Sequence, residues 1–123
     1  MNGVTMPSYR FSASVTMNAR NDVDFMERVR AMHDRLTSMR EIRSLSLTNN
    51  LDSRRVNMSF VFDSADPQTA DLDSGRILLR ALKAGDVWKG ESNDPEPDDA
   101  EDVDRECDRY AKRQYMQLTP ANE

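Results

Sequence analysis

Few side chains in this sequence have the chemistry that catalysis or metal binding requires. His33 is the only histidine, so a metal site would need several carboxylates to converge on it. The only cysteine, Cys107, lies between Glu106 and Asp108, and neighbouring negative charges disfavour the thiolate that acts as a nucleophile. We therefore expect His33 to lie at the boundary of a helix and Cys107 to be inert.

The loops that commonly hold ions or phosphates are also missing. The run from Asp71 to Gly75 superficially resembles a cation loop, but it lacks the third acidic position and the closing glutamate of an EF-hand. Asp71 and Asp73 are better explained as first-turn charges of a helix. The four glycines, at positions 3, 75, 85 and 90, cannot form a Walker loop or a dinucleotide fingerprint. The sequence thus predicts no cofactor, no metal site and no catalytic residue, and we expect a protein that is not an enzyme.

Two groups of side chains are candidates for binding a partner. Arginines on and after a predicted helix make a basic region, although interleaved acidic residues such as Asp24 and Asp34 equally favour a solvated, ion-paired helix face. Aromatic and methionine side chains near the end of the chain would suit anchors in a partner's groove. The predicted partner-binding residues are Arg28, Arg35, Arg40, Arg54, Arg55, Tyr110, Tyr115 and Met116.

The composition is that of one small domain. The chain has 123 residues, of which 37% are hydrophobic and 32% charged, which suits one hydrophobic core. It has no apolar run near the roughly 18 residues of a membrane-spanning helix, and residues 1–10 lack the order of a signal peptide. We therefore expect a cytoplasmic protein without a membrane partner. Fourteen arginines against three lysines suit a GC-rich genome, and a phage gene is one hypothesis.

The charge is unevenly distributed along the chain. The net charge is −5, yet residues 1–90 contain 13 basic and 11 acidic residues, whereas residues 91–104 contain eight acidic residues and no basic one. Like charges repel, the two prolines of that stretch oppose helix formation, and it offers almost no apolar side chain to bury. We predict a disordered acidic linker at residues 91–104 that could screen the arginines by folding back over them.

The regular elements begin with a strand and a helix. Apolar and polar residues alternate strictly over residues 9–17, as expected for a half-buried strand. Asn21 can cap a helix, and Asp22 and Asp24 place negative charge in its first turn. The helix carries a single apolar stripe, formed by Phe25, Val29, Met32, Leu36 and Met39.

A hairpin and a second helix follow. Leu45 and Leu47 alternate with polar residues, as do the apolar residues from Val56 to Phe62, and a turn region separates the two runs. A helix is predicted after Pro67, with Gly85 as a left-handed cap. Val87-Trp88 would form a short fourth strand. A third helix from Asp102 to Gln117 rests on a weak stripe, formed by Val103, Cys107, Tyr110 and Gln114.

These elements predict an α+β fold with the helices on one face of an antiparallel sheet. A right-handed crossover from the first strand to the second, with the third strand between them, gives a ferredoxin-like split β-α-β arrangement. We expect a flexible N-terminus at residues 1–8, an α+β domain at 9–90, the acidic linker at 91–104 and a C-terminal tail, helical in part, at 105–123.

The open face of this sheet would carry serine, threonine and asparagine and no aromatic residue. RNA-binding sheets stack bases on exposed aromatic rings, so we expect nucleic acid to be disfavoured as a partner. The first strand would lie at the sheet edge, where unpaired backbone groups invite another strand. A homodimer could therefore form through that edge or through the Ser/Thr face.

The sequence leaves three functions open. The leading hypothesis is a small non-enzymatic accessory or regulatory protein that binds another protein or associates with itself. The second is a protein that engages nucleic acid through its arginines or mimics DNA through its acidic segment. The third is a ferredoxin-like domain that binds a small molecule, which would require a concave pocket with convergent polar groups.

Overall fold

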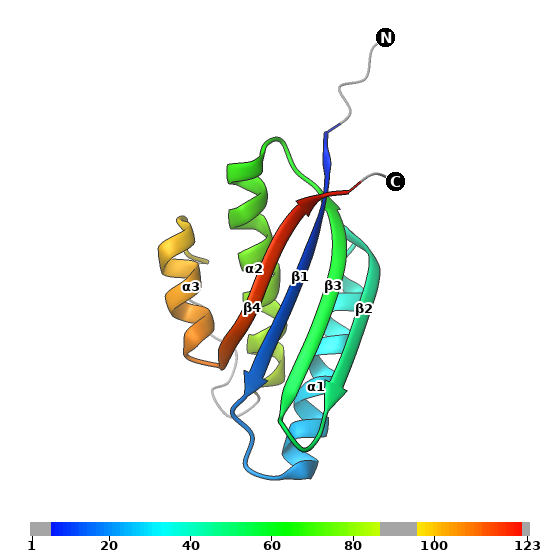
Figure 1. The fold of residues 1–123 in the computed structure, drawn as a ribbon. Coiled ribbons are helices and arrows are strands. Elements are labelled where there is room, and N and C mark those ends of the chain that lie inside the picture. Colours follow the sequence, from blue (N-terminus) through cyan, green and yellow to red (C-terminus); the bar gives the residue numbers. More distant parts are fainter. Residues whose placement is uncertain (1–5, 87–95, 122–123) are drawn as a thin grey trace.

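The computed structural model describes residues 6–86 and 96–121. In chain order the elements are β1 (Ser8–Met17), α1 (Asp22–Ser38), β2 (Ile42–Asn50), β3 (Arg55–Asp63), α2 (Pro67–Gly85), α3 (Ala100–Asp108) and β4 (Ala111–Pro120). The four strands of the described residues form one antiparallel sheet in the order β2-β3-β1-β4. Figure 1 shows the helices behind this sheet and its other face open toward the viewer. The predicted α+β class is confirmed.

Strand β1 lies inside the sheet. Its odd-numbered residues, from Tyr9 to Met17, are buried, as the alternation predicts. It pairs with β3 on one side and with β4 on the other. The prediction that the first strand is an edge is therefore wrong, because β4, which the sequence did not reveal, covers that side. Among the described strands, β2 and β4 form the two edges.

Helix α1 agrees closely with its sequence pattern. Asn21 Oδ1 accepts a hydrogen bond from the Asp24 backbone N–H at 2.8 Å, so the predicted cap is present. The stripe that runs from Phe25 to Met39 is buried against the sheet and α2. The helix has 17 residues, or about five turns at 3.6 residues per turn.

Helix α2 is capped by Asp66, whose Oδ1 accepts from the Thr69 N–H at 2.8 Å. Gly85 is not the left-handed cap that we predicted, since it is the last residue of the helix and Asp86 follows as the cap. A Cβ at Gly85 would lie 3.1 Å from the Arg28 carbonyl oxygen. Glycine is suited to this position because α1 and α2 approach each other closely there.

Strand β2 contains a bulge. It begins at Ile42, before the predicted alternation, and its register with β3 shifts between Arg43 and Ser46. Ser44, inside this shift, has a positive φ of 54°, which is typical of a bulge residue. Leu45 and the next alternating leucine are partly buried against the core, as predicted.

The C-terminal part of the chain differs most from the prediction. Residues 91–95 lie outside the described residues, as does the strand expected at Val87-Trp88. Residues 96–104 do not form a disordered linker, because they lead into α3 and form its first half. The helix predicted up to Gln117 ends at Asp108, and β4 pairs with β1 where a tail was expected.

Apolar packing and arginine contacts explain why this part is ordered. Val103 and Cys107 of α3 are buried against α2, and a Cβ at Gly75 would lie only 2.8 Å from Val103 Cγ1. Ahead of α3, Arg80 Nη2 donates to Glu96 Oε2 at 2.9 Å. Arg76 on the same helix donates to the carbonyl oxygen of Pro97 at 2.8 Å. Glu96 and Asp98 thus meet arginines of α2, and Asp104 meets Arg113 of β4, not the arginines of the basic region that we expected.

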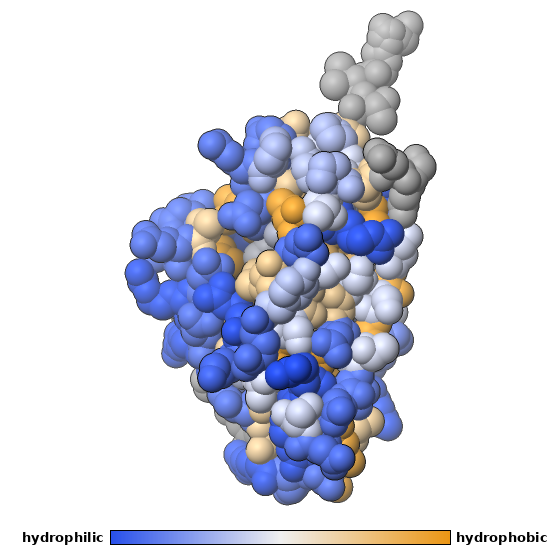
Figure 2. All heavy atoms as spheres, viewed as in Figure 1, coloured by the Kyte–Doolittle hydropathy of each residue, from blue (hydrophilic) through white to orange (hydrophobic). Residues whose placement is uncertain are grey.

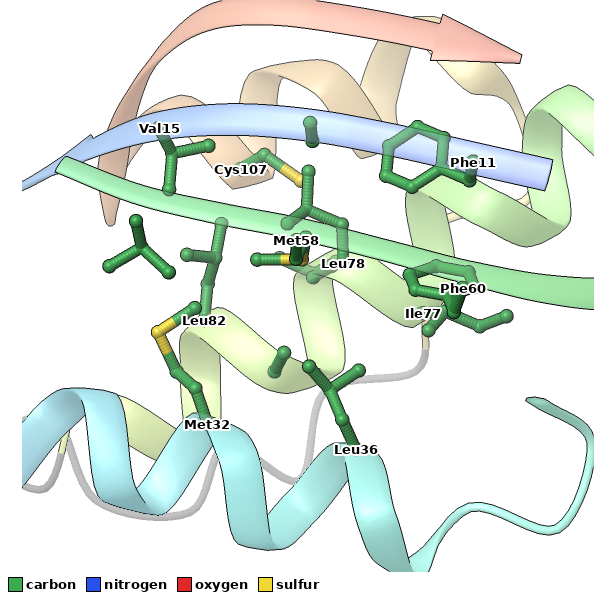
Figure 3. Packing of buried hydrophobic residues seen from close by; sticks show 14 of the residues in the cluster. Phe11, Val15, Met32, Leu36, Met58, Phe60, Ile77, Leu78, Leu82 and Cys107 are labelled. Carbon is green, nitrogen blue, oxygen red and sulfur yellow. The ribbon is translucent and has the colours of Figure 1, made fainter. Parts of the chain in front are cut away.

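The hydrophobic core lies between the sheet and the helices. Figure 3 shows Phe11 and Phe60 projecting from neighbouring strands toward Ile77 of α2, and the centroids of the two phenylalanine rings are 5.3 Å apart. Cys107, Tyr110 and Ala111 from the C-terminal part join the same core. Within residues 6–86 and 96–121, no helix is long and apolar enough to cross a membrane.

Candidate functional site

One face of the sheet is packed against helices, and no described element covers the other. The strand register places sixteen side chains of the uncovered face in four rows across the sheet. In the order β2, β3, β1, β4 the rows are Arg43-Val61-Arg10-Thr119, Ser46-Ser59-Ser12-Gln117, Thr48-Asn57-Ser14-Tyr115 and Asn50-Arg55-Thr16-Lys112. We call this surface the open face. Figure 2 shows it with pale, weakly polar residues along the middle and strongly hydrophilic ones around them.

The middle two rows form a shallow hollow. It has a volume of about 220 Å³, and small hydroxyl and amide side chains line most of it. Ser14 lies in these rows, and its Oγ is buried without a hydrogen-bond partner among the described residues. A buried hydroxyl without a partner is costly, so the floor of the hollow retains an unused donor and acceptor.

Tyr115 borders this hollow from β4. Its side chain is 51% exposed, and its hydroxyl donates to Gln117 Oε1 of the same strand. A second hollow, of about 520 Å³, lies along β4. Its lining residues include Lys112, Gln114 and Tyr115. The expectation that the open face has no aromatic residue is therefore wrong, because the segment that we read as a helix is a strand.

Basic side chains occupy both ends of the open face. Arg10 and Arg43 belong to the first row, and Arg55 and Lys112 belong to the last. None of the sixteen residues is acidic, and the next row on the same face, Ser8-Asp63, adds one carboxylate. Six residues of antiparallel strand separate the two basic rows, a distance of about 20 Å at roughly 3.4 Å per residue.

These cations differ in how far the protein already pairs them. Arg43 Nη2 lies 3.0 Å from Asp63 Oδ1. The hydrogen bond from the Ser8 hydroxyl, and after it the one from Arg43, lowers the pKa of Asp63. Arg10 Nη1 donates to Ser59 Oγ at 3.2 Å. Arg55 and Lys112 are exposed and have no ion pair within residues 6–86 and 96–121. The open face thus has positive charge available at both ends.

Two of the predicted binding arginines have structural roles. Arg28 is buried, and its Nε lies 3.2 Å from Asp24 Oδ1. Arg54 Nη1 lies 2.6 Å from Asp22 Oδ1, and its guanidinium lies 5.6 Å from the centroid of the Phe25 ring. Both side chains hold the beginning of α1 in place, which leaves them little freedom to bind a partner.

The remaining predicted arginines do not form a patch. Arg35 and Arg40 are exposed near the end of α1, whereas Arg55 follows the β2–β3 turn beside the beginning of that helix. A helix of 17 residues is about 25 Å long at 1.5 Å per residue. Of the five arginines that the sequence singled out, the structure places only Arg55 on the open face.

The three predicted anchors near the C-terminus are also separated. Tyr110 is buried in the core, and Met116 of β4 packs partly against it. Only Tyr115 is exposed, on the opposite side of the sheet from Met116. They therefore do not form the apolar stripe of a docking helix.

Reactive side chains lie away from the open face. Burial raises the pKa of the Cys107 thiol to about 12, so the thiolate is disfavoured more strongly than its acidic neighbours alone would cause. His33 is exposed on α1, with Nδ1 3.8 Å from Asp34 Oδ1. Among the described residues, no three His, Cys, Asp or Glu side chains lie close enough together to hold a metal ion.

No protein-family model matches this sequence, and no curated protein matches it. The function therefore has to be inferred from the geometry of this chain. The open face is the part of that geometry that offers exposed charge, an aromatic ring and a hollow together.

Proposed function

We propose that this protein is a non-enzymatic accessory protein of the cytoplasm and that the open face is its binding surface. The main support is the contrast between a sheet face buried under helices and a face that carries four cations against one carboxylate, that of Asp63. Arginine and tyrosine, both present there, are residue types that contribute strongly to binding interfaces. The unpartnered Ser14 hydroxyl adds a group that a partner could satisfy.

The high pKa of the Cys107 thiol supports a binding role over a catalytic one. A thiol with a pKa of about 12 does not act as a nucleophile at neutral pH. The hollow of the middle rows, about 220 Å³, is smaller than the 300–1,000 Å³ that is usual for small-molecule sites, whereas the second hollow along β4, about 520 Å³, is within that range. The separation of the cations over about 20 Å favours a macromolecular partner over a small molecule.

We infer that the fold is a ferredoxin-like split β-α-β arrangement. The position of β3 between β1 and β2, and of β4 beside β1, supports this assignment, with α3 inserted ahead of β4. Folds of this kind carry many unrelated functions. The proposal therefore rests on the side chains of the open face and not on the fold.

Self-association is the second candidate, and the structure gives it less support. The strand β1 is not available as an edge, and each edge strand has an irregular register, β2 near Ser44 and β4 near Gln114. Bulges of this kind oppose the addition of another strand. Stacking two open faces would bring four cations of each copy together with only one carboxylate, that of Asp63, from each. A partner that differs from this chain fits better.

Site-specific photo-crosslinking would test the proposal. A photoreactive residue replaces Thr48 on the open face in one variant and Thr37 on the exposed side of α1 in the control. In extracts of the native host we expect specific adducts from position 48 and background from position 37. Adducts confined to position 37, or equal yields from both positions, would contradict the open face as the binding surface.

A further inference from the structure

We propose that the partner of the open face is single-stranded nucleic acid. This inference rests on the proposed function, since it names the ligand of the same surface. Single-stranded nucleic acid is bound by grooves that combine positive charge with aromatic rings on which bases stack. The open face provides cations at both ends and the exposed ring of Tyr115 between two hollows.

The charge pattern fits a phosphate backbone. The four cations lie in two rows about 20 Å apart, so a strand that runs along the face would meet positive charge on entering and on leaving it. Arg55 and Lys112 have no competing ion pair among the described residues, and Arg10 is held only by a serine hydroxyl. Several other arginines of the described surface meet carboxylates, as Arg113 does with Asp108 at 2.8 Å, whereas Arg30, Arg35 and Arg40 have no ion pair among the described residues.

The middle rows favour nucleobases over the carboxylates of an acidic peptide. A carboxylate only accepts hydrogen bonds, so a surface built for it needs donors. Serine, threonine, asparagine and glutamine both donate and accept, as do the edges of bases. Small side chains such as Ser12, Ser46 and Ser59 also leave room for a flat ring. The unpartnered Ser14 Oγ lies among them.

A single strand is favoured over a duplex by the shape of the face. The major groove of DNA, about 12 Å wide, admits a helix or a two-stranded ribbon, whereas here four strands lie side by side. At about 4.8 Å between strands such a sheet is too broad to enter a groove. The lack of an aromatic ring was one objection from the sequence, and Tyr115 removes it.

Fluorescence anisotropy with the full chain tests the inference. The probes are labelled oligothymidylate and oligouridylate of about twelve nucleotides, a length within the usual range for single-strand sites, at about 50 mM salt, where such contacts are strong. We expect saturable binding that weakens as salt rises. Arg10→Glu and Lys112→Glu should each weaken it at least about tenfold, and Tyr115→Ala by roughly 5- to 150-fold, with Tyr115→Phe close to the native protein.

Arg30→Glu is the matched control. Arg30 is exposed on α1, away from the sheet, and the substitution makes the same change in net charge. It should alter the affinity less than about twofold if binding is local. Equal losses in Arg30→Glu and in the open-face variants would overturn the inference by showing only a general charge effect. Thermal melts of each variant confirm that it is folded.

The outcomes separate this inference from the proposed function. If the oligonucleotides do not bind, while position 48 crosslinks to a protein or to a second copy of the chain, nucleic acid is ruled out and the open face remains the binding surface. Binding of a glutamate-rich peptide that the same open-face variants abolish, in place of oligonucleotide binding, would assign an acidic protein. Absence of adducts from position 48 would overturn both.

Discussion

The two faces of the sheet are made from the same strands but have different roles. Along β3, Met58, Phe60 and Phe62 are buried against the helices, while Asn57 and Ser59 between them belong to the open face. On the helix side, the described ion pairs are satisfied within the chain, as between Arg80 and Glu96. On the open face, Arg55, Lys112 and the Ser14 hydroxyl have no such partner among the described residues. The contrast shows where the chain obtains its stability and where it keeps interactions available for a partner.

Val61 departs from the simple alternation in a way that supports this contrast. It belongs to the open face by register, yet it has no exposed surface and is not part of the main core. Its cross-strand neighbours are Arg10 and Arg43, and long arginine stems commonly cover apolar side chains. The arginines of the first row are therefore supported by an apolar contact below them.

The largest expected effect comes from removing α3 and β4. A chain that ends at Gly90 loses Val103, Cys107 and Ala111 from the core and leaves one side of β1 without backbone partners. We expect the loss of stability to exceed the roughly 3–5 kcal/mol of one buried aromatic residue. Differential scanning calorimetry should then show no cooperative transition. A transition like that of the full chain would mean that residues 1–90 fold alone, as the sequence suggested.

Two adjacent residues of β3 compare the faces directly. Phe60 has no exposed surface and contacts the Phe11 ring, so Phe60→Ala should lower the free energy of unfolding by about 3–5 kcal/mol. Ser59→Ala, on the open face, should change it by less than about 0.5 kcal/mol. Urea denaturation measures both. Similar losses at the two positions would indicate that the open face is covered, as in a stacked dimer.

The sequence predicted the first part of the fold because its signals are local. The alternation in β1, the Asn21 cap and the stripe from Phe25 to Met39 each need only a few neighbouring residues to be recognised. Strand β4 was missed for two reasons. Its register with β1 shifts near Gln114, and Arg113, a charged residue, occupies a position opposite the buried Val15, where the alternation calls for an apolar residue. The stripe of α3 was found, but its cap, Asp99, was obscured by the surrounding acidic residues.

The candidate site was harder to predict because it is built from distant parts of the chain. Arg10, Arg43 and Lys112 come together only through strand register, which the sequence does not show. The arginines that were chosen are close in sequence, yet Arg28 and Arg54 are used to hold the beginning of α1. Tyr115 was correctly chosen as exposed, but for a helix that does not extend so far.

Acid should lower the stability of the protein by protonating Glu96, which accepts a hydrogen bond from Arg80 of α2. The hydrogen bond from Arg80 is the main reason that the pKa of Glu96 lies below its ordinary value of 4.5. A lowered pKa in the folded state adds stability above the ordinary value, and this is lost as the pH falls through the lowered one. The difference in unfolding free energy between the native protein and Glu96→Gln should therefore be constant near neutral pH and shrink below about pH 4. It should not exceed about 1 kcal/mol, because the pair is partly exposed.

Glu27→Gln is a suitable control for that measurement, since Glu27 is an exposed residue of α1. The difference between this variant and the native protein should show no comparable loss on acidification. If Glu96→Gln is as stable as the native protein at neutral pH, the contact with Arg80 does not stabilise the segment that leads into α3.

The smallest expected effect is at Ser14. Its Oγ is buried without a partner, so Ser14→Ala removes an unsatisfied group and fills nearly the same space. We expect the free energy of unfolding to stay within about 0.5 kcal/mol of the native value or to rise slightly. A loss of more than about 1 kcal/mol in urea denaturation would show that the hydroxyl is satisfied in the free protein.

The open face as the binding surface is the central claim, and an NMR titration tests it most directly. Backbone amide shifts of the full chain are followed as unlabelled oligothymidylate is added. We expect the changes to be concentrated in β1, β3 and β4, around Ser12, Asn57 and Tyr115, with α1 and the exposed side of α2 unchanged. Changes concentrated in the helices would contradict the open face as the binding surface, and no changes at high oligonucleotide concentration would contradict nucleic acid as its partner.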